Sequence, residues 1–285
     1  MKNPLKDIDW NEVWKSQMTA NRESSPGRDC ARIWESRESA LRFWDMCRQE
    51  RSRIDQTVWE TEITPKSRVL DIGAGPGTLA IPFSEKALEV TAVEPADGMC
   101  SVMREKMAEF GRENITIVEK RWEDVDVKSD LKPPYDIVIA SFSLGMQDIR
   151  AAIEKMIQAT SRFVYLYHFA GETSWDRQWQ VLWPRLHGRD YQPGPKCDVL
   201  YNVLYQMGIY PHVRPFRLEH SQRYSTLDEA VATLVPQAQA RTDEQRAILR
   251  EYLVGALREE DGAFLMPGSS MRVKIWWDKQ EIGGI

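Results

Sequence analysis

The stretch that decides the fold is Val69-Leu-Asp-Ile-Gly-Ala-Gly-Pro-Gly-Thr78, an apolar strand that runs directly into a glycine-rich loop. Glycines at positions 73, 75 and 77 allow a sharp turn and let a ligand approach bare backbone. A nucleotide-binding dehydrogenase would have its third glycine at position 78, but Thr78 stands there. The spacing is therefore G-x-G-x-G, preceded by the acid Asp71.

Outward from this stretch, short apolar segments alternate with helical ones, which is typical of a parallel sheet covered on both faces. Further along the chain, two more extended segments bring the expected number of strands to about seven. The pattern predicts an α/β fold with a doubly wound sheet. The predicted strands are 68–72, 90–94, 115–119, 136–141, 163–167, 210–219 and 272–277, and the helices between the first five are 78–87, 98–110 and 149–160.

The segments on either side of this core are expected to be mainly helical. We predict that residues 1–60 form an N-terminal helical lid, with helices at 9–18 and 29–51 separated by a loop. Residues 61–285 are then the main domain, with substrate-side insertions around 170–200 and 225–260. The first insertion carries three indoles at helical spacing and is expected to break at the proline-rich stretch from Trp183 to Lys196.

The composition is that of an ordinary globular protein, with 285 residues, 42% hydrophobic and 28% charged. The net charge of −5 disfavours a nucleic-acid partner. No apolar run reaches the length of about 18 residues that a membrane span needs, and we expect a cytoplasmic protein with no membrane partner. Cys30, Cys47, Cys100 and Cys197 lack the close spacing of zinc sites, so no metal site is predicted.

Together with a second acid, the glycine loop resembles the class I S-adenosylmethionine-dependent methyltransferases. Their first motif is an acid followed by G-x-G-x-G at the end of the first strand. Glu94 closes the next strand 17 residues after Gly77, where the family places its ribose-binding carboxylate. The resemblance implies a Rossmann-like methyltransferase sheet, S-adenosylmethionine as cofactor, and an enzyme that transfers the methyl group to another molecule.

The chemistry of S-adenosylmethionine gives physical reasons for both acids. A carboxylate at the end of the second strand, here Glu94, can accept hydrogen bonds from both ribose hydroxyls. Asp71 can supply negative charge toward the ammonium of the methionine tail, directly or through water. Alternatively, Asp71 caps the amides of the glycine loop.

On the adenine side, the resemblance points to the residues after the third strand. Trp122 and Glu123 match best by position, although Trp122 could be a core residue and Asp124 could be the acid. Met99 is a candidate apolar wall for the other face of the adenine. The predicted cofactor-binding residues are Asp71, Gly73, Ala74, Gly75, Gly77, Thr78, Glu94, Pro95, Met99, Trp122, Glu123 and Ser141.

Methyl transfer is an in-line displacement that depends mainly on positioning and on excluding water. In the family, the segment after the fourth strand, here Ser141 to Met146, faces the methyl group. It lacks the Asn/Asp-Pro-Pro-aromatic signature of amino-methyltransferases of DNA, so a small-molecule acceptor is expected. Phe142 and Met146 suggest an apolar or planar acceptor, or else they pack beneath a helix.

His168 and Tyr167, at the end of the fifth strand, are the candidates for a catalytic base. A hydrogen-bonded structural role is the alternative for His168. The eleven tryptophans gather outside the central region, where they either pack a core or line a pocket. Two other functions remain open: a non-catalytic protein that binds S-adenosylmethionine, and a metalloid methyltransferase that uses the cysteines.

Overall fold

The computed structural model describes residues 7–25, 34–49 and 51–281. Its centre is one mixed sheet in the order β3-β2-β1-β4-β5-β8-β6, with the short β7 paired to β8. The first five strands are parallel and β8 runs antiparallel to β5. The strands are β1 Arg68–Ile72, β2 Glu89–Val93, β3 Ile115–Val118, β4 Tyr135–Ser141, β5 Thr160–Phe169, β6 His212–Tyr224, β7 Arg258–Glu260 and β8 Ala263–Asp278.

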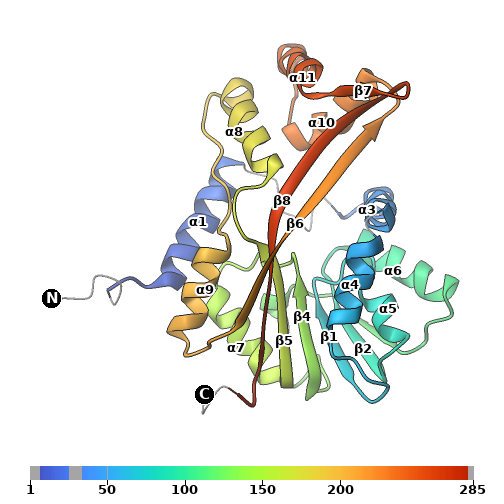
Figure 1. Ribbon diagram of the computed structural model, residues 1–285, viewed down its shortest axis with the longest axis vertical. Coiled ribbons are helices and arrows are strands. Elements are labelled where there is room, and N and C mark those ends of the chain that lie inside the picture. Colours follow the sequence, from blue (N-terminus) through green and yellow to red (C-terminus); the bar gives the residue numbers. More distant parts are fainter. Residues whose placement is uncertain (1–6, 26–33, 50, 282–285) are drawn as a thin grey trace.

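Helices cover both faces of this sheet (Figure 1), which confirms the doubly wound α/β prediction. One face packs on α1, α7 and α9, and the other on α3 to α6. The helices are α1 Trp10–Ser24, α3 Arg37–Gln49, α4 Arg51–Glu60, α5 Ala80–Ser84, α6 Asp97–Glu109, α7 Ile149–Ala159, α8 Ser174–His187, α9 Cys197–Gln206, α10 Leu227–Ala238 and α11 Asp243–Ala256, with a 3-10 turn, η1, at Trp122–Asp124.

The β6–β8 pair is much longer than the sequence pattern indicated. The last residue of β5, Phe169, pairs with Arg272, so residues 263–271 of β8 continue past the carboxyl end of β5 and pair only with β6 and β7. These two strands rise above the sheet as an arm that carries α10 and α11 (Figure 1). The arm was missed because its residues do not keep a simple alternation of apolar and polar side chains.

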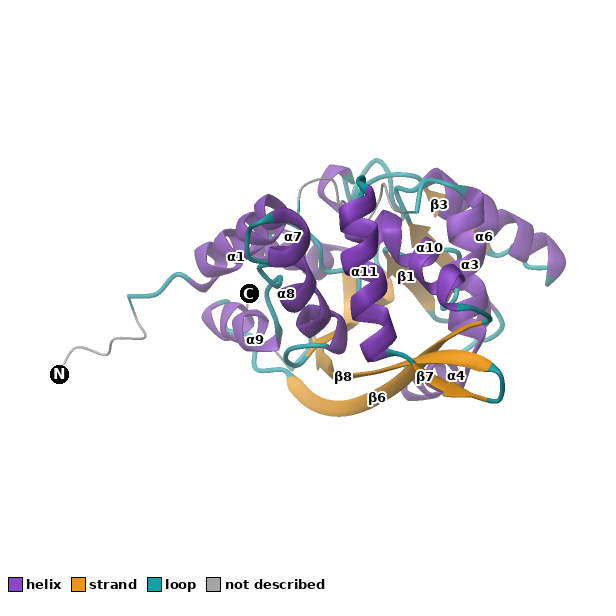
Figure 2. Cartoon of the chain, turned by 90° about the horizontal axis from the view of Figure 1, so that it is seen from above, coloured by secondary structure: helices purple, strands orange, loops and turns teal. Residues whose placement is uncertain are grey.

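A separate apolar core joins the arm to α8. Trp179 and Trp183 of α8 pack edge to face, with ring centroids 5.8 Å apart, among buried side chains of α10 and α11. Seen from above, α11 lies beside α8, and the arm runs along one edge of the molecule (Figure 2). These indoles therefore pack a core, which was the first of the two readings of the tryptophans.

The helix after the glycine loop is shorter than the predicted range 78–87, and the break expected between Trp183 and Lys196 lies at Gly188. This helix begins at Ala80 and spans five residues, so Pro82 lies in its first turn, where a missing N–H costs little. Helix α8 continues through Pro184 and ends at Gly188, which adopts the left-handed conformation.

Within the described ranges, no helix combines the length and apolar character that crossing a bilayer requires.

The N-terminal helices lie on the two faces of the sheet. Helix α1 packs beside α7 and α9, and α3 packs on α6. The part of the predicted helix 29–51 before Trp34 lies outside the described residues. Trp44 in α3 is buried in the core of that face. Helix α4, which was not predicted, completes the cover over the same face.

Candidate cofactor and acceptor site

The glycine loop turns sharply where β1 ends, against the end of β2. The amides of Gly73 and Ala74 donate to the Val93 carbonyl over 2.8 and 3.1 Å. Gly73 has φ of +69°, and a Cβ there would lie 2.3 Å from Cβ of Ser143. Glycine is therefore required at position 73 both for the backbone conformation and for the approach of the segment after β4.

Glu94 stands one residue beyond β2 and holds the loop with its carboxylate. One oxygen accepts from the amide of Gly75 and the other from the amide of Ala96, each over 2.9 Å. Burial raises the pKa of Glu94, while these two hydrogen bonds act in the opposite direction. A carboxylate has about four acceptor positions, so the same group can accept two further hydroxyl donors.

Asp71 is buried in β1, next to Glu94, with 1% of its surface exposed. Burial, and secondly the charge of Glu94, raise the pKa of Asp71 to about 7. Its Oδ2 atom has no hydrogen-bond partner among the described residues. The amides of Gly73, Ala74 and Gly75 are bonded to Val93 and Glu94 instead, so Asp71 does not cap them and keeps an acceptor for a cationic ligand.

The side chains of the residues predicted to contact the adenine do not all face one common site. Met99 is buried in the core between α6 and the sheet. The Trp122 indole is buried on the other face and donates to the Ala152 carbonyl over 3.1 Å, as its core alternative predicts. The η1 backbone is held by Lys155, whose Nζ donates to the carbonyls of Trp122 and Glu123 over 2.8 and 2.9 Å. The Glu123 side chain is exposed, as is that of Asp124.

The remaining predicted contacts of the cofactor lie around the same loop. Ala74, within the loop, is buried. Gly77 needs its positive φ of +87°, and a Cβ there would meet Met103. Thr78 and Pro95 are half-buried at the ends of the two motifs, and Ser141 is half-buried at the carboxyl end of β4. The assignment of these residues to the cofactor stays a prediction.

An aromatic wall lies along the carboxyl ends of β4 and β5. It consists of Phe142, Phe169 and Trp175, whose rings follow one another with centroids 5.2 Å apart in each step. Phe142 has φ of +56°. This conformation is rare for residues other than glycine and occurs preferentially at functional sites. The buried guanidinium of Arg272 lies 4.7 Å from the centre of the Phe142 ring.

Sequence reasoning missed most of this wall. Phe169 and Arg272 face each other across the β5–β8 pairing, 103 positions apart in the chain, and no local pattern indicates that pairing. Met146, which was named with Phe142, is buried in the core instead, so its packing alternative holds. The strained conformation of Phe142 leaves no signal in its residue type.

His168 lies behind this wall, on the face of the sheet covered by α1. Its Nε2 lies 3.0 Å from the Pro195 carbonyl, so Nε2 carries the proton and Nδ1 is the basic nitrogen. Burial lowers the pKa of His168 to about 4. Burial also raises the pKa of the Tyr167 hydroxyl. Neither group titrates near neutral pH, and the placement of His168 favours its structural alternative.

A cavity of about 890 Å³ opens elsewhere, between the start of α1, α7 and the end of α9. Three of its charged groups are engaged with the protein: Arg150 pairs with Asp9 over 3.0 Å, and Lys279 donates to two backbone carbonyls. None of the predicted cofactor or catalytic residues lines this cavity. Among the described residues, no group of three or more His, Cys, Asp or Glu side chains is placed to hold a metal ion.

The strand order, with its antiparallel β8, and the acid-framed glycine loop are those of the class I, Rossmann-like methyltransferase fold. Residues 69–162 match the family described as "Methyltransferase domain". The match covers β1 to the start of β5, which includes every predicted cofactor-binding residue.

Curated relatives share this central part. An uncharacterized protein of Haemophilus influenzae is 32% identical over 146 residues, which are 50% of this chain and 50% of that protein. The uncharacterized methyltransferase YcgJ of Bacillus subtilis is 29% identical over 115 residues, 39% of this chain and 44% of that protein. The chain thus spans about half the length of these relatives.

Solved structures show the same fold over a larger part of the chain. The crystal structure of YcgJ covers 78% of this chain and 97% of its own, with a TM-score of 0.52 and 16% identity. A putative methyltransferase from Bacillus halodurans covers 80% of this chain and 97% of its own, with a TM-score of 0.55 and 13% identity. At these identities the likeness concerns the fold.

Proposed function

We propose that this chain binds S-adenosylmethionine at the glycine loop and transfers its methyl group to a small, planar acceptor. The observation that carries the proposal is that two buried acids, Asp71 and Glu94, meet beside the glycine loop at the carboxyl ends of β1 and β2, and that Glu94 also accepts from the Gly75 amide. A buried carboxylate without a partner is costly in a cofactor-free protein. A cationic ligand with two hydroxyls satisfies both acids.

Different residues bind different parts of the cofactor. Glu94 accepts from the ribose hydroxyls while it keeps the Gly75 and Ala96 amides in place. Asp71 attracts the ammonium of the methionine tail, and the loop gives that tail close access to backbone. When bound, S-adenosylmethionine supplies an electrophilic methyl group on a sulfonium.

The acceptor is placed by the aromatic wall of Phe142, Phe169 and Trp175, which directly follows the strand end facing the methyl group in this family. Partly exposed rings at the edge of a sheet stack well on a planar molecule. A thiolate or an amine can attack without a base. An acceptor hydroxyl would need one.

The buried cysteines do not favour the metalloid alternative. Cys47 and Cys100 are buried, and burial raises the pKa of the Cys100 thiol to about 12. Its Sγ is also engaged, because it donates to the Glu94 carbonyl over 3.3 Å. Thiols of this kind are poor ligands for a metalloid, since the thiolate is the binding form.

The test is incubation of the protein with S-adenosylmethionine labelled on the methyl group and with fractionated cell extract. We expect S-adenosylhomocysteine to form and the label to appear in a small molecule, which mass analysis identifies. Calorimetry with S-adenosylmethionine and with NAD is the accompanying control. Binding of S-adenosylmethionine without turnover in any fraction would support the non-catalytic alternative, and tight binding of NAD alone would refute the proposal.

A further inference from the structure

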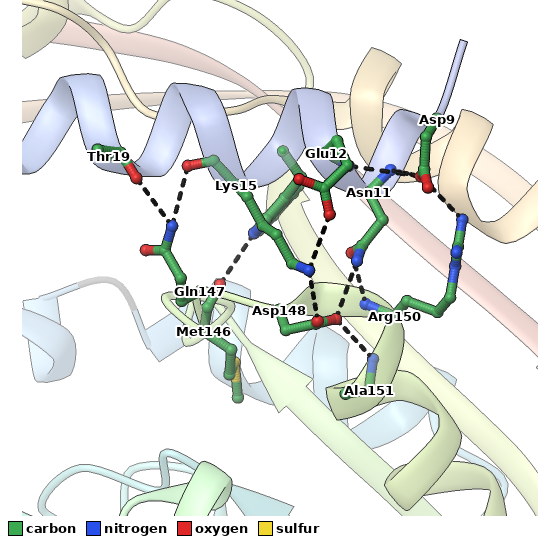
Figure 3. Close-up of polar contacts among 11 residues, drawn as sticks. Asp9, Asn11, Glu12, Lys15, Thr19, Met146, Gln147, Asp148, Arg150 and Ala151 are labelled. Atoms are coloured by element: carbon green, nitrogen blue, oxygen red, sulfur yellow. Dashed lines mark hydrogen bonds and ion pairs between the residues drawn. The ribbon is translucent and has the colours of Figure 1, made fainter. Parts of the chain in front are cut away.

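Four consecutive residues of the loop between β4 and α7 are each bonded to the same helix, α1. Figure 3 shows these bonds for Met146, Gln147 and Asp148. The Gly145 carbonyl accepts from Arg22 over 3.0 Å, and the Met146 carbonyl accepts from the Trp14 indole over 2.9 Å. The Gln147 amide donates to the Lys15 carbonyl over 2.9 Å. This loop directly follows the strand end that faces the transferred methyl group in the proposed function.

The fourth residue, Asp148, is the N-cap of α7 and receives two bonds from α1. Its Oδ1 accepts from the Asn11 side chain over 3.0 Å, and its Oδ2 lies 2.8 Å from Nζ of Lys15. The other end of the Asn11 amide accepts from the backbone N–H of Arg150 over 3.0 Å. Asn11 is 4% exposed. Both its donor and its acceptor are therefore hydrogen-bonded in a buried position, where the loss of either bond would destabilise the protein most.

Trp14 extends the contact to the neighbouring strand. The side chain is fully buried, and its ring centroid lies 5.7 Å from that of His168, at the end of β5. One indole thus contacts both the loop after β4 and the end of β5. At the other end of the loop, Ser143 Oγ donates to the Ile72 carbonyl over 2.5 Å and lies against Gly73. The loop is therefore held on one side by α1 and on the other by the cofactor motif.

We infer that α1 is a fixed positioning element for the acceptor edge of the active site, acting through Asn11 and Trp14, and that it does not open as a lid. The inference rests on the proposed function. A helix that hinged away would break the bonds to Gly145, Met146, Gln147 and Asp148 together and would leave buried polar groups without partners. A helix that stays fixes the backbone that leads from Phe142 to α7, and small displacements of such a backbone can lower a rate by about a hundredfold.

The first test does not depend on activity. Exchange of the Trp14 indole proton and of the Arg150 amide proton is followed by NMR in the full chain, with the Trp59 indole, which is 80% exposed, as the internal reference. We expect both protons to exchange at least about a hundredfold more slowly than the Trp59 indole. Exchange of the Trp14 indole at the rate of Trp59 would overturn the inference, whatever the protein catalyses.

The second test uses Asn11→Ala and Trp14→Phe, with Ser16→Ala on the exposed side of α1 as the matched control. The readouts are the affinity for S-adenosylmethionine, the Arg150 exchange rate, and the rate of S-adenosylhomocysteine formation with the extract fraction that becomes labelled. We expect the rate to fall about tenfold or more in both variants, faster Arg150 exchange in Asn11→Ala, and a cofactor affinity within about twofold of the parent. Ser16→Ala should match the parent.

The outcomes are separable. No turnover by the parent would refute the proposed function and leave the exchange test to decide on the fixed helix. Turnover within twofold of the parent in both variants would overturn the positioning role, as would an Arg150 exchange rate unchanged by Asn11→Ala. If Asn11→Ala does not fold, Trp14→Phe, which keeps an aromatic ring but removes the N–H donor and part of the indole volume, decides alone.

Discussion

The carboxylate of Glu94 accepts a hydrogen bond of 2.9 Å from the backbone amide of Gly75, across the ends of two neighbouring strands. This bond joins the two motifs of the cofactor site before any ligand is present. It also explains why the acid and the middle glycine occur together, since the glycine has φ of +58° and turns its amide toward the acid. The two motifs act as one structural unit.

Glu94→Gln should weaken binding of S-adenosylmethionine by about 1.5–3 kcal/mol, which is roughly ten- to 150-fold in Kd. The amide keeps the shape of the side chain but loses the charge and one acceptor. Calorimetry measures the effect. Glu89→Gln, at the opposite end of the same strand and paired with Arg68, is the control and should leave Kd unchanged. Equal losses in the two variants would contradict a role for Glu94 in the site.

Cofactor binding should depend on pH through Asp71. Burial and the charge of Glu94 raise the pKa of Asp71 from 3.8 to about 7, so the folded protein holds a proton there that the unfolded chain has lost. This group therefore makes the free protein less stable as pH rises from about 4 to 7. The ammonium of the cofactor favours the ionised form, so affinity should rise with pH up to about 7.

Calorimetry between pH 6 and pH 8 checks this dependence. Asp71→Asn should bind S-adenosylmethionine more weakly and almost independently of pH. Asp55→Asn, on the exposed side of α4, should behave like the parent. Affinity of the parent that stays constant across this range would show that Asp71 does not exchange a proton on binding.

Gly73→Ala should destabilise the protein more than Gly111→Ala. Both glycines have a positive φ, of +69° and +62°, but a Cβ at position 73 would lie 2.3 Å from Ser143, whereas nothing lies within 4 Å at position 111. Gly111→Ala should cost only the conformational strain, about 1–2 kcal/mol. Urea unfolding measures both, and an equal loss would mean that the loop after β4 does not press on Gly73.

Trp179→Ala should lower the free energy of unfolding by about 3–5 kcal/mol. The indole is 2% exposed and belongs to the core that α8 shares with α10 and α11. Trp59→Ala is the control, because that indole is 80% exposed. A variant that kept its stability and lost only acceptor affinity would instead support a pocket lined by Trp179.

His168 should make the folded protein less stable at acid pH. It should not produce a change in the reaction rate near pH 6.5. Burial lowers the pKa of His168 to about 4, so the neutral form stabilises the fold above pH 6.5, and this stability is lost as pH falls from 6.5 to 4. His168→Gln should reduce that loss in unfolding experiments across this range. His212→Gln, stacked on Trp276 near the surface, should not. If His168 acts as a base, kcat/KM should fall near pH 4.

Local patterns were sufficient to predict the central fold and the candidate cofactor loop. The strand β1 and the helix α7 lie almost where the pattern put them, because buried parallel strands and amphipathic helices carry their signal in consecutive residues. The same holds for Gly73 to Gly77 and Glu94, whose spacing in the chain reflects two adjacent strand ends. Their geometry follows from local sequence plus one strand pairing.

The acceptor edge was decided by tertiary structure. Arg272 reaches Phe142 only because β8 inserts antiparallel beside β5, and Asn11 meets Asp148 across 137 positions of chain. The role of the tryptophans was likewise open, since the spacing of Trp179 and Trp183 fits a core and a pocket equally well. Sequence determined the methyl-donor loop because that signal is local; contacts between distant segments have no local signal, so only the folded chain shows which side chains surround the acceptor.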